Sequence, residues 1–79
     1  MKLWQVEVIV DSAGSHGEAY LVTLWAPSIG LARDGARVAI EANISRGQTI
    51  RDLSLPKELT DPASRELIAL VSIEPAGPR

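Results

Sequence analysis

The chain has 79 residues, with ten acidic and eight basic side chains that leave a formal net charge of −2. Cysteine is absent, so disulfide bonds and thiolate metal sites are excluded. A chain this short buries only about 60% of its unfolded surface, and we expect one thin-cored domain over residues 1–79. The basic residues form no run or stripe, which argues against direct binding to nucleic acid.

The N-terminal third of the sequence predicts a β-hairpin. Residues 2–10 and 18–26 alternate with the period of half-buried strands, and the Gly- and Ser-rich residues 11–17 separate them. Pairing that is symmetric about Gly14 gathers the even-numbered residues of both strands on one apolar face, the even face. A slip by one residue would mix the two faces, so the pattern favours this register. The expected pairs are Val8 with Tyr20, Val6 with Val22, Trp4 with Leu24 and, on the other face, Leu3 with Trp25.

Residues 28–45 are expected to form a helix. Ser28 suits the N-cap, and Gly47 suits the position that follows a helix C-terminus. Gly35 predicts close packing against a bulky neighbour such as Trp4 or Tyr20, since glycine costs roughly 1 kcal/mol of helix propensity relative to alanine. A helical wheel gives one apolar face, made of Leu31, Ala32, Gly35, Val38, Ala39 and Ala42. The charged side carries Arg33, Asp34, Arg37 and Glu41.

The C-terminal third is less regular. Residues 48–62 predict a short extended piece and a turn, because prolines interrupt regular structure there. Residues 66–74 alternate again and predict a third strand, whereas residues 75–79 are expected to form a frayed tail.

These elements predict an α+β fold in the order ββαβ. The helix connects the second and third strands, so those strands would run parallel if they share a sheet. A right-handed crossover then places the third strand beside the first. We expect a three-stranded, mostly antiparallel sheet in the spatial order 2-1-3, with the helix packed on the even face.

No constellation in the sequence predicts catalysis. One histidine without cysteine cannot build a convincing metal site. His16 lies in the loop at residues 11–17 with serine and aspartate side chains, but a hydrolytic triad needs side chains from well-separated supports. We therefore expect a non-enzymatic protein without a cofactor. No apolar run approaches the ~20 residues of a membrane span, and we expect a cytoplasmic location without membrane contact.

The opposite sheet face, the odd face, is the candidate for partner binding. It is too apolar for a solvated face and too polar for a second core, and apolar patches with polar rims mark interaction sites. Residues 48–60 could instead fold across it as a lid, or two copies could pair through it. The candidate interface residues are Leu3, Leu21, Trp25, Ile68 and Leu70 on this face, with Arg33, Arg37 and Glu41 on the charged side of the helix.

Residues 1–46 and 66–74 combine a hairpin, an Ala26-x-Ser28 start to an Ala-rich helix, and a late strand. This pattern resembles that of small proteins encoded by phages and mobile elements, among them anti-CRISPR proteins. The resemblance implies a non-enzymatic inhibitor that binds a CRISPR effector complex and blocks recognition of target DNA. Because no acidic run imitates a phosphate backbone, the expected mode is occlusion of a protein surface.

The sequence therefore favours a protein-binding inhibitor module, as a monomer or a homodimer. Two alternatives stay open. One is a nucleic-acid-binding accessory protein that uses Trp25 with Arg33, Arg37 and Arg46. The other is a structural subunit that associates with itself.

Overall fold

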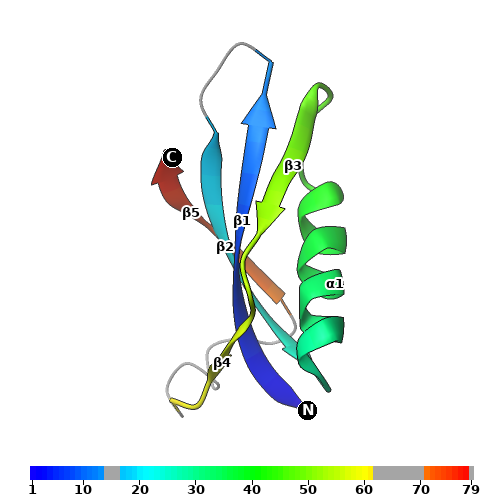
Figure 1. Ribbon diagram of the computed structural model, residues 1–79, viewed down its shortest axis with the longest axis vertical. Coiled ribbons are helices and arrows are strands. Elements are labelled where there is room, and N and C mark those ends of the chain that lie inside the picture. The colour runs from blue at the N-terminus through cyan, green and yellow to red at the C-terminus, as the bar shows by residue number, and fades with distance from the viewer. Residues whose placement is uncertain (14–16, 62–70, 79) are drawn as a thin grey trace.

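The computed structural model describes residues 1–13, 17–61 and 71–78. Within them the chain is an α+β protein with one helix and an antiparallel sheet of five strands (Figure 1). The elements in chain order are β1 (Lys2–Ser12), β2 (Glu18–Ala26), α1 (Ile29–Glu41), β3 (Gln48–Leu53), β4 (Lys57–Leu59) and β5 (Val71–Pro78).

The predicted hairpin is confirmed residue by residue. β1 and β2 pair antiparallel with Val6 opposite Val22 and Leu3 opposite Trp25. The even face is the core face, as expected, because the alternation makes that side of both strands almost wholly apolar. Its buried members are Trp4, Val6, Val8, Val10, Val22, Leu24 and Ala26.

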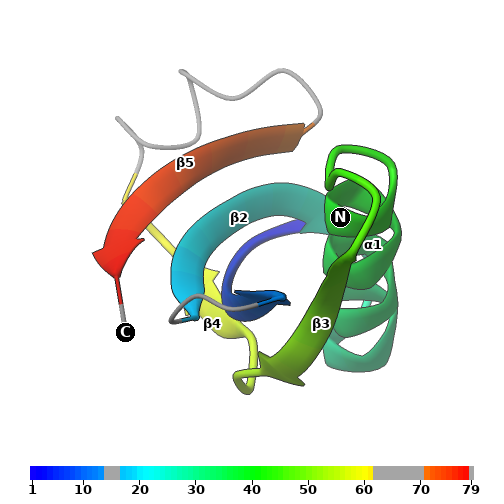
Figure 2. The ribbon, with the colours of Figure 1, turned by 90° about the horizontal axis from the view of Figure 1, so that it is seen from above.

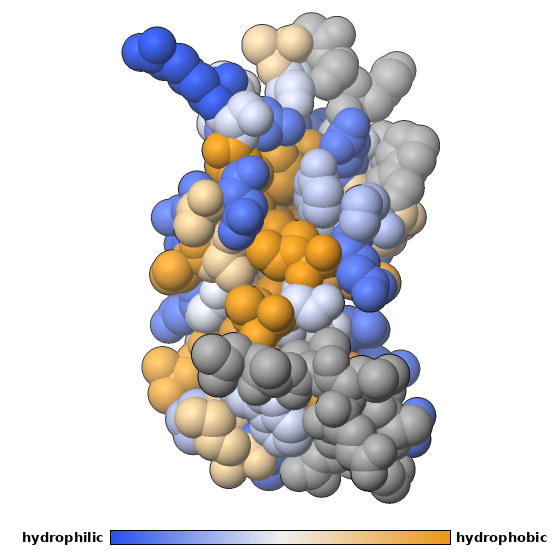
Figure 3. Space-filling model, turned by 180° about the vertical axis from the view of Figure 1, so that it is seen from behind, coloured by the Kyte–Doolittle hydropathy of each residue, from blue (hydrophilic) through white to orange (hydrophobic). Residues whose placement is uncertain are grey.

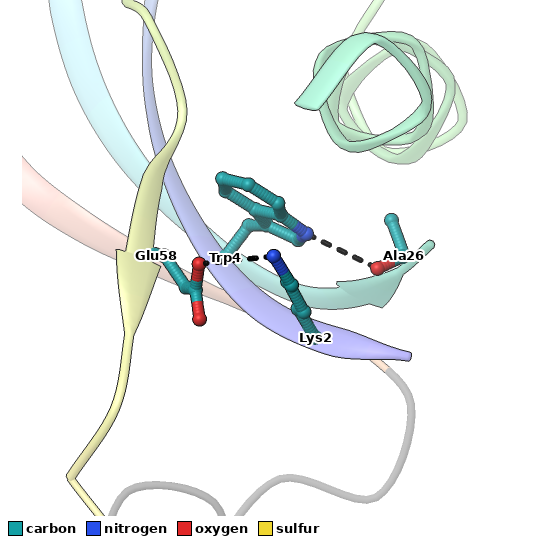
Figure 4. A network of polar contacts seen from close by, with 4 residues as sticks. All are labelled: Lys2, Trp4, Ala26 and Glu58. Carbon is teal, nitrogen blue, oxygen red and sulfur yellow. Dashed lines mark hydrogen bonds and ion pairs between the residues drawn. The ribbon is translucent and has the colours of Figure 1, made fainter. Parts of the chain in front are cut away.

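The indole of Trp4 is buried in this core, and its polar atom is satisfied there. Its Nε1–H donates to the carbonyl oxygen of Ala26 at 3.1 Å (Figure 4). An unpaired buried donor would cost about 1–3 kcal/mol, so this bond removes the penalty of burying a tryptophan. On the surface nearby, Lys2 and Glu58 form an ion pair at 3.6 Å between β1 and β4.

The predicted strand order 2-1-3 is wrong. The order is β3-β1-β2-β5, and β4 also pairs with β1. Two short strands from residues 48–59 occupy the second edge of β1, so the last strand pairs with the free edge of β2 and runs antiparallel to it. Residues 75–78, expected in the tail, belong to β5.

β3 and β4 extend the sheet rather than cover its odd face. The pairing of β1 with β3 is irregular at Ile9 and Val10. Between β3 and β4, Ser54 donates its N–H to the Glu7 carbonyl oxygen at 2.9 Å, and its Oγ accepts the Glu7 N–H at 2.8 Å. Ser54 thus keeps the chain on the edge of β1 between the two short strands. The sheet twists strongly along its length (Figure 2).

The helix begins where the sequence predicts and ends earlier. Ser28 is the N-cap, and its Oγ accepts the Leu31 N–H at 3.3 Å. The helix ends at Glu41 rather than near Ser45. Gly47 has a φ of +88° in the turn before β3, so it serves that turn instead of following the helix directly.

The buried face of α1 is rotated from the predicted one. Ala32, Ala36 and Ile40 are buried against the sheet, whereas Leu31 and Val38 are 54% and 64% exposed. Small side chains allow the helix to lie close to β1 and β2. A Cβ added at Gly35 would lie 2.7 Å from Cδ1 of Leu24, so Gly35 does pack closely against a bulky neighbour, which is Leu24 rather than Trp4 or Tyr20.

Alanine substitutions at two helical glycines test this close approach. Gly30 has open space around it, so Gly30→Ala should raise the free energy of unfolding by about 0.5–1 kcal/mol through helix propensity. Gly35→Ala gains the same propensity but must displace the Leu24 methyl group, and it should give no gain or a net loss. Urea unfolding followed by circular dichroism measures both. Equal stabilisation by the two substitutions would contradict the contact.

Candidate functional site

An exposed apolar groove runs along one flank of α1, where the helix meets β2 and the start of β5. Its volume is about 740 Å³. Seen from behind, apolar side chains gather across the middle of the molecule (Figure 3). The residues that line this apolar groove are Met1, Leu24, Trp25, Leu31, Asp34, Gly35, Val38, Ala39 and Val71.

The rotation of α1 produces this groove. Leu31 and Val38 are two turns apart on one flank of the helix, and they stand free because the smaller Ala32 and Ala36 occupy the sheet side. Met1, which precedes β1, and Val71, which begins β5, add exposed apolar side chains to the groove. They are 81% and 48% exposed. Large apolar side chains gathered at one exposed place mark an interaction surface.

Apolar side chains dominate the lining of the apolar groove. Among the described residues that line it, Asp34 is the one with a charged side chain. Elsewhere, among the residues that the structure describes, no three histidine or carboxylate side chains gather as a metal site would require.

The Tyr20 hydroxyl donates to Glu18 at 2.8 Å, and this hydrogen bond raises the pKa of Tyr20. His16 lies outside the described residues.

A second groove lies on the other flank of α1, between the helix and β3. Its volume is about 460 Å³. Arg33, Arg37 and Glu41 line it at successive helical turns, and β3 lines it along its whole length. We call it the charged groove.

The structure distributes the predicted interface residues over different surroundings. Leu3 is 1% exposed and offers almost no surface to a partner, and Leu21 is half-buried. Trp25 is half-buried and lines the apolar groove. The three predicted residues of the helix, Arg33, Arg37 and Glu41, line the charged groove. Ile68 and Leu70 lie outside the described residues.

Of the described residues that line the apolar groove, the sequence predicted only Trp25 as an interface residue. The exposed apolar members that it missed are Met1, Leu31, Val38 and Val71. It assigned Leu31 and Val38 to the core because they share the apolar face of the helical wheel with Ala32 and Ala39. The contrary signal was present in the spacing of Ala32, Ala36 and Ile40, which also recur at every helical turn. Choosing between the two stripes requires the shape of the sheet below.

No protein-family model matches this chain, and no curated protein or solved structure is significantly similar to it. Within the described residues, no helix has the length and apolar character needed to cross a membrane. Function is therefore inferred from the two grooves.

Glutamine substitutions at two positions of α1 test the observed helix rotation. Val38→Gln should change the free energy of unfolding by no more than about 0.5 kcal/mol, because the side chain is mostly exposed. Ala36→Gln should cost about 1–3 kcal/mol or more, since a larger polar group must enter a filled core. Urea unfolding compares the two variants. A larger loss at Val38 than at Ala36 would restore the helix face predicted from the sequence.

Proposed function

We propose that the chain is a protein-binding inhibitor module that seats an apolar helix of its target in the apolar groove. The observation that carries the proposal is the set of exposed apolar side chains around Trp25, contributed by Met1, Leu31, Val38 and Val71. Burying apolar surface is the main favourable term in most protein association.

The size of the groove favours one helix of a target over a second copy of this chain. Nine of the residues that the structure describes line it, whereas a stable interface uses roughly 20–30 residues on each side. Leu31 and Val38 are seven residues apart, which is the repeat with which packed helices meet. Ala39, a small half-buried residue on the same flank, leaves room for an approaching helix.

The target class in this proposal is a CRISPR effector complex. The pattern of hairpin, helix and late strand, which resembles that of anti-CRISPR proteins, supports it. A net charge of −2 without an acidic run supports occlusion of a protein surface over imitation of DNA. Nucleic-acid binding has weaker support, because Trp25 lines one groove while Arg33 and Arg37 line the other.

Phage plating on a strain with active CRISPR interference tests this function. Expression of the chain should restore plaque formation by a targeted phage. The double variant Leu31→Gln/Val38→Gln should lose this effect while it keeps its unfolding midpoint, because both side chains are more than half exposed. Circular dichroism of the purified variant checks that it is folded.

The matched control is Arg46→Gln, an exposed position outside both grooves, which should inhibit as the unmodified chain does. Normal interference in the presence of the unmodified chain, with no association with the purified effector complex, rules out the anti-CRISPR version. Light scattering could also show a dimer that Leu31→Gln/Val38→Gln dissociates. In that case the apolar groove binds a second copy of the chain and not a helix of a target.

A further inference from the structure

The charged groove has an edge strand of the sheet along one side. β3 pairs with β1 and has no sheet neighbour on its other edge within the described chain. Both ribbon views place β3 beside α1 (Figures 1 and 2). An edge strand leaves a row of backbone N–H and C=O groups that can pair with another extended chain. Residues of β3 and of α1 line the two sides of the charged groove, and we call the space between them the slot.

The walls of this slot differ in character. Ile44 and Ile50, both half-buried, contribute apolar surface beside the edge of β3, whereas Leu53 is buried at the base of the groove. The helix contributes Arg33, Arg37 and Glu41, all exposed and one turn apart. The slot therefore combines backbone pairing, apolar contact and a line of charges, which are the requirements for recognising an extended peptide.

Two of these charges have no partner in the described chain. Arg33 and Arg37 make no ion pair and no hydrogen bond through their side chains with any residue that the structure describes. Arg51, which also lines the groove, differs, because its Nε donates to Asp11 at 2.7 Å. The guanidinium groups of Arg33 and Arg37 are thus available to carboxylates from outside.

The spacing of the two arginines matches a strand. Residues four apart on an α-helix are about 6 Å apart along its axis. Residues two apart on a β-strand are about 6.6 Å apart and point to the same side. Two acidic side chains at alternate positions of an extended peptide can therefore reach Arg33 and Arg37 together.

We propose that an extended acidic segment of a partner protein binds in the charged groove as an added strand on β3. Two carboxylates at alternate positions pair with Arg33 and Arg37 through charge-assisted hydrogen bonds. Glu41, one turn further along α1, disfavours a third acidic residue in that series. This site lies on the other flank of α1 from the apolar groove and does not depend on the function proposed for that groove.

Selection of short random peptides displayed on phage against the full-length chain tests the proposal. Enriched peptides should carry acidic residues at alternate positions. Arg33→Gln/Arg37→Gln should weaken binding of these synthetic peptides by about tenfold or more for each arginine, the scale of a charge-assisted hydrogen bond. Glutamine keeps helix propensity and adds no repulsion with Glu41, so this variant should fold normally.

The matched control is Arg46→Gln/Lys57→Gln, which makes the same change in net charge at exposed positions outside the groove. It should leave peptide affinity unchanged. Leu31→Gln/Val38→Gln should also leave it unchanged, which separates this site from the apolar groove.

Amide hydrogen exchange provides the second measurement. Peptide binding should slow exchange of amides in β3, because an added strand pairs with that edge. Enriched peptides that lack acidic pairs, or that bind the arginine variant and the unmodified chain equally, would overturn the proposal. So would peptide binding without protection of β3, a selection that enriches no sequence, or protection of β3 by a single-stranded oligonucleotide in place of peptide.

Discussion

The close contact of α1 with the sheet determines the shape of this protein. Gly35 lies so near Leu24 that an added Cβ would overlap the leucine. Ala32 and Ala36, on the side of α1 that faces the sheet, are fully buried. With small residues at the contact, the helix axis lies near the strands. The larger apolar residues Leu31 and Val38 then have no room on the sheet side and stand on a flank. The same contact thus completes a thin core and leaves an apolar groove open.

The second determinant is the length of β1. This strand of 11 residues pairs with β2 along one edge, and along the other it pairs first with β3 and then with β4. Both of its edges are therefore used, and β5 must join the sheet at β2. The arrangement leaves β3 as an outer strand beside α1, where its free edge and the arginines of the helix form the charged groove.

The two grooves lie on opposite flanks of one helix, and they suit different kinds of contact. Within the described residues, the apolar groove offers side-chain burial with a single charged side chain, whereas the charged groove offers a strand edge and two arginines that have no ion-pair partner. None of the described residues that line one groove lines the other, so a substitution in one groove leaves the lining of the other unchanged.

Local pattern by itself determined the hairpin and the start of the helix. A period of two makes any slip in register expose the valines of the even face, and Ser28 caps the helix through its own hydroxyl. Tertiary structure alone decided the rotation of α1, because Leu31 with Val38 and Ala32 with Ala36 form competing stripes, and the sheet accepts the smaller one. It also decided the strand order, since the short extended piece expected within residues 48–62 forms two strands, β3 and β4, that both pair with β1. Both grooves follow from these two decisions, so the sequence contained the residues of each site without showing which of them meet.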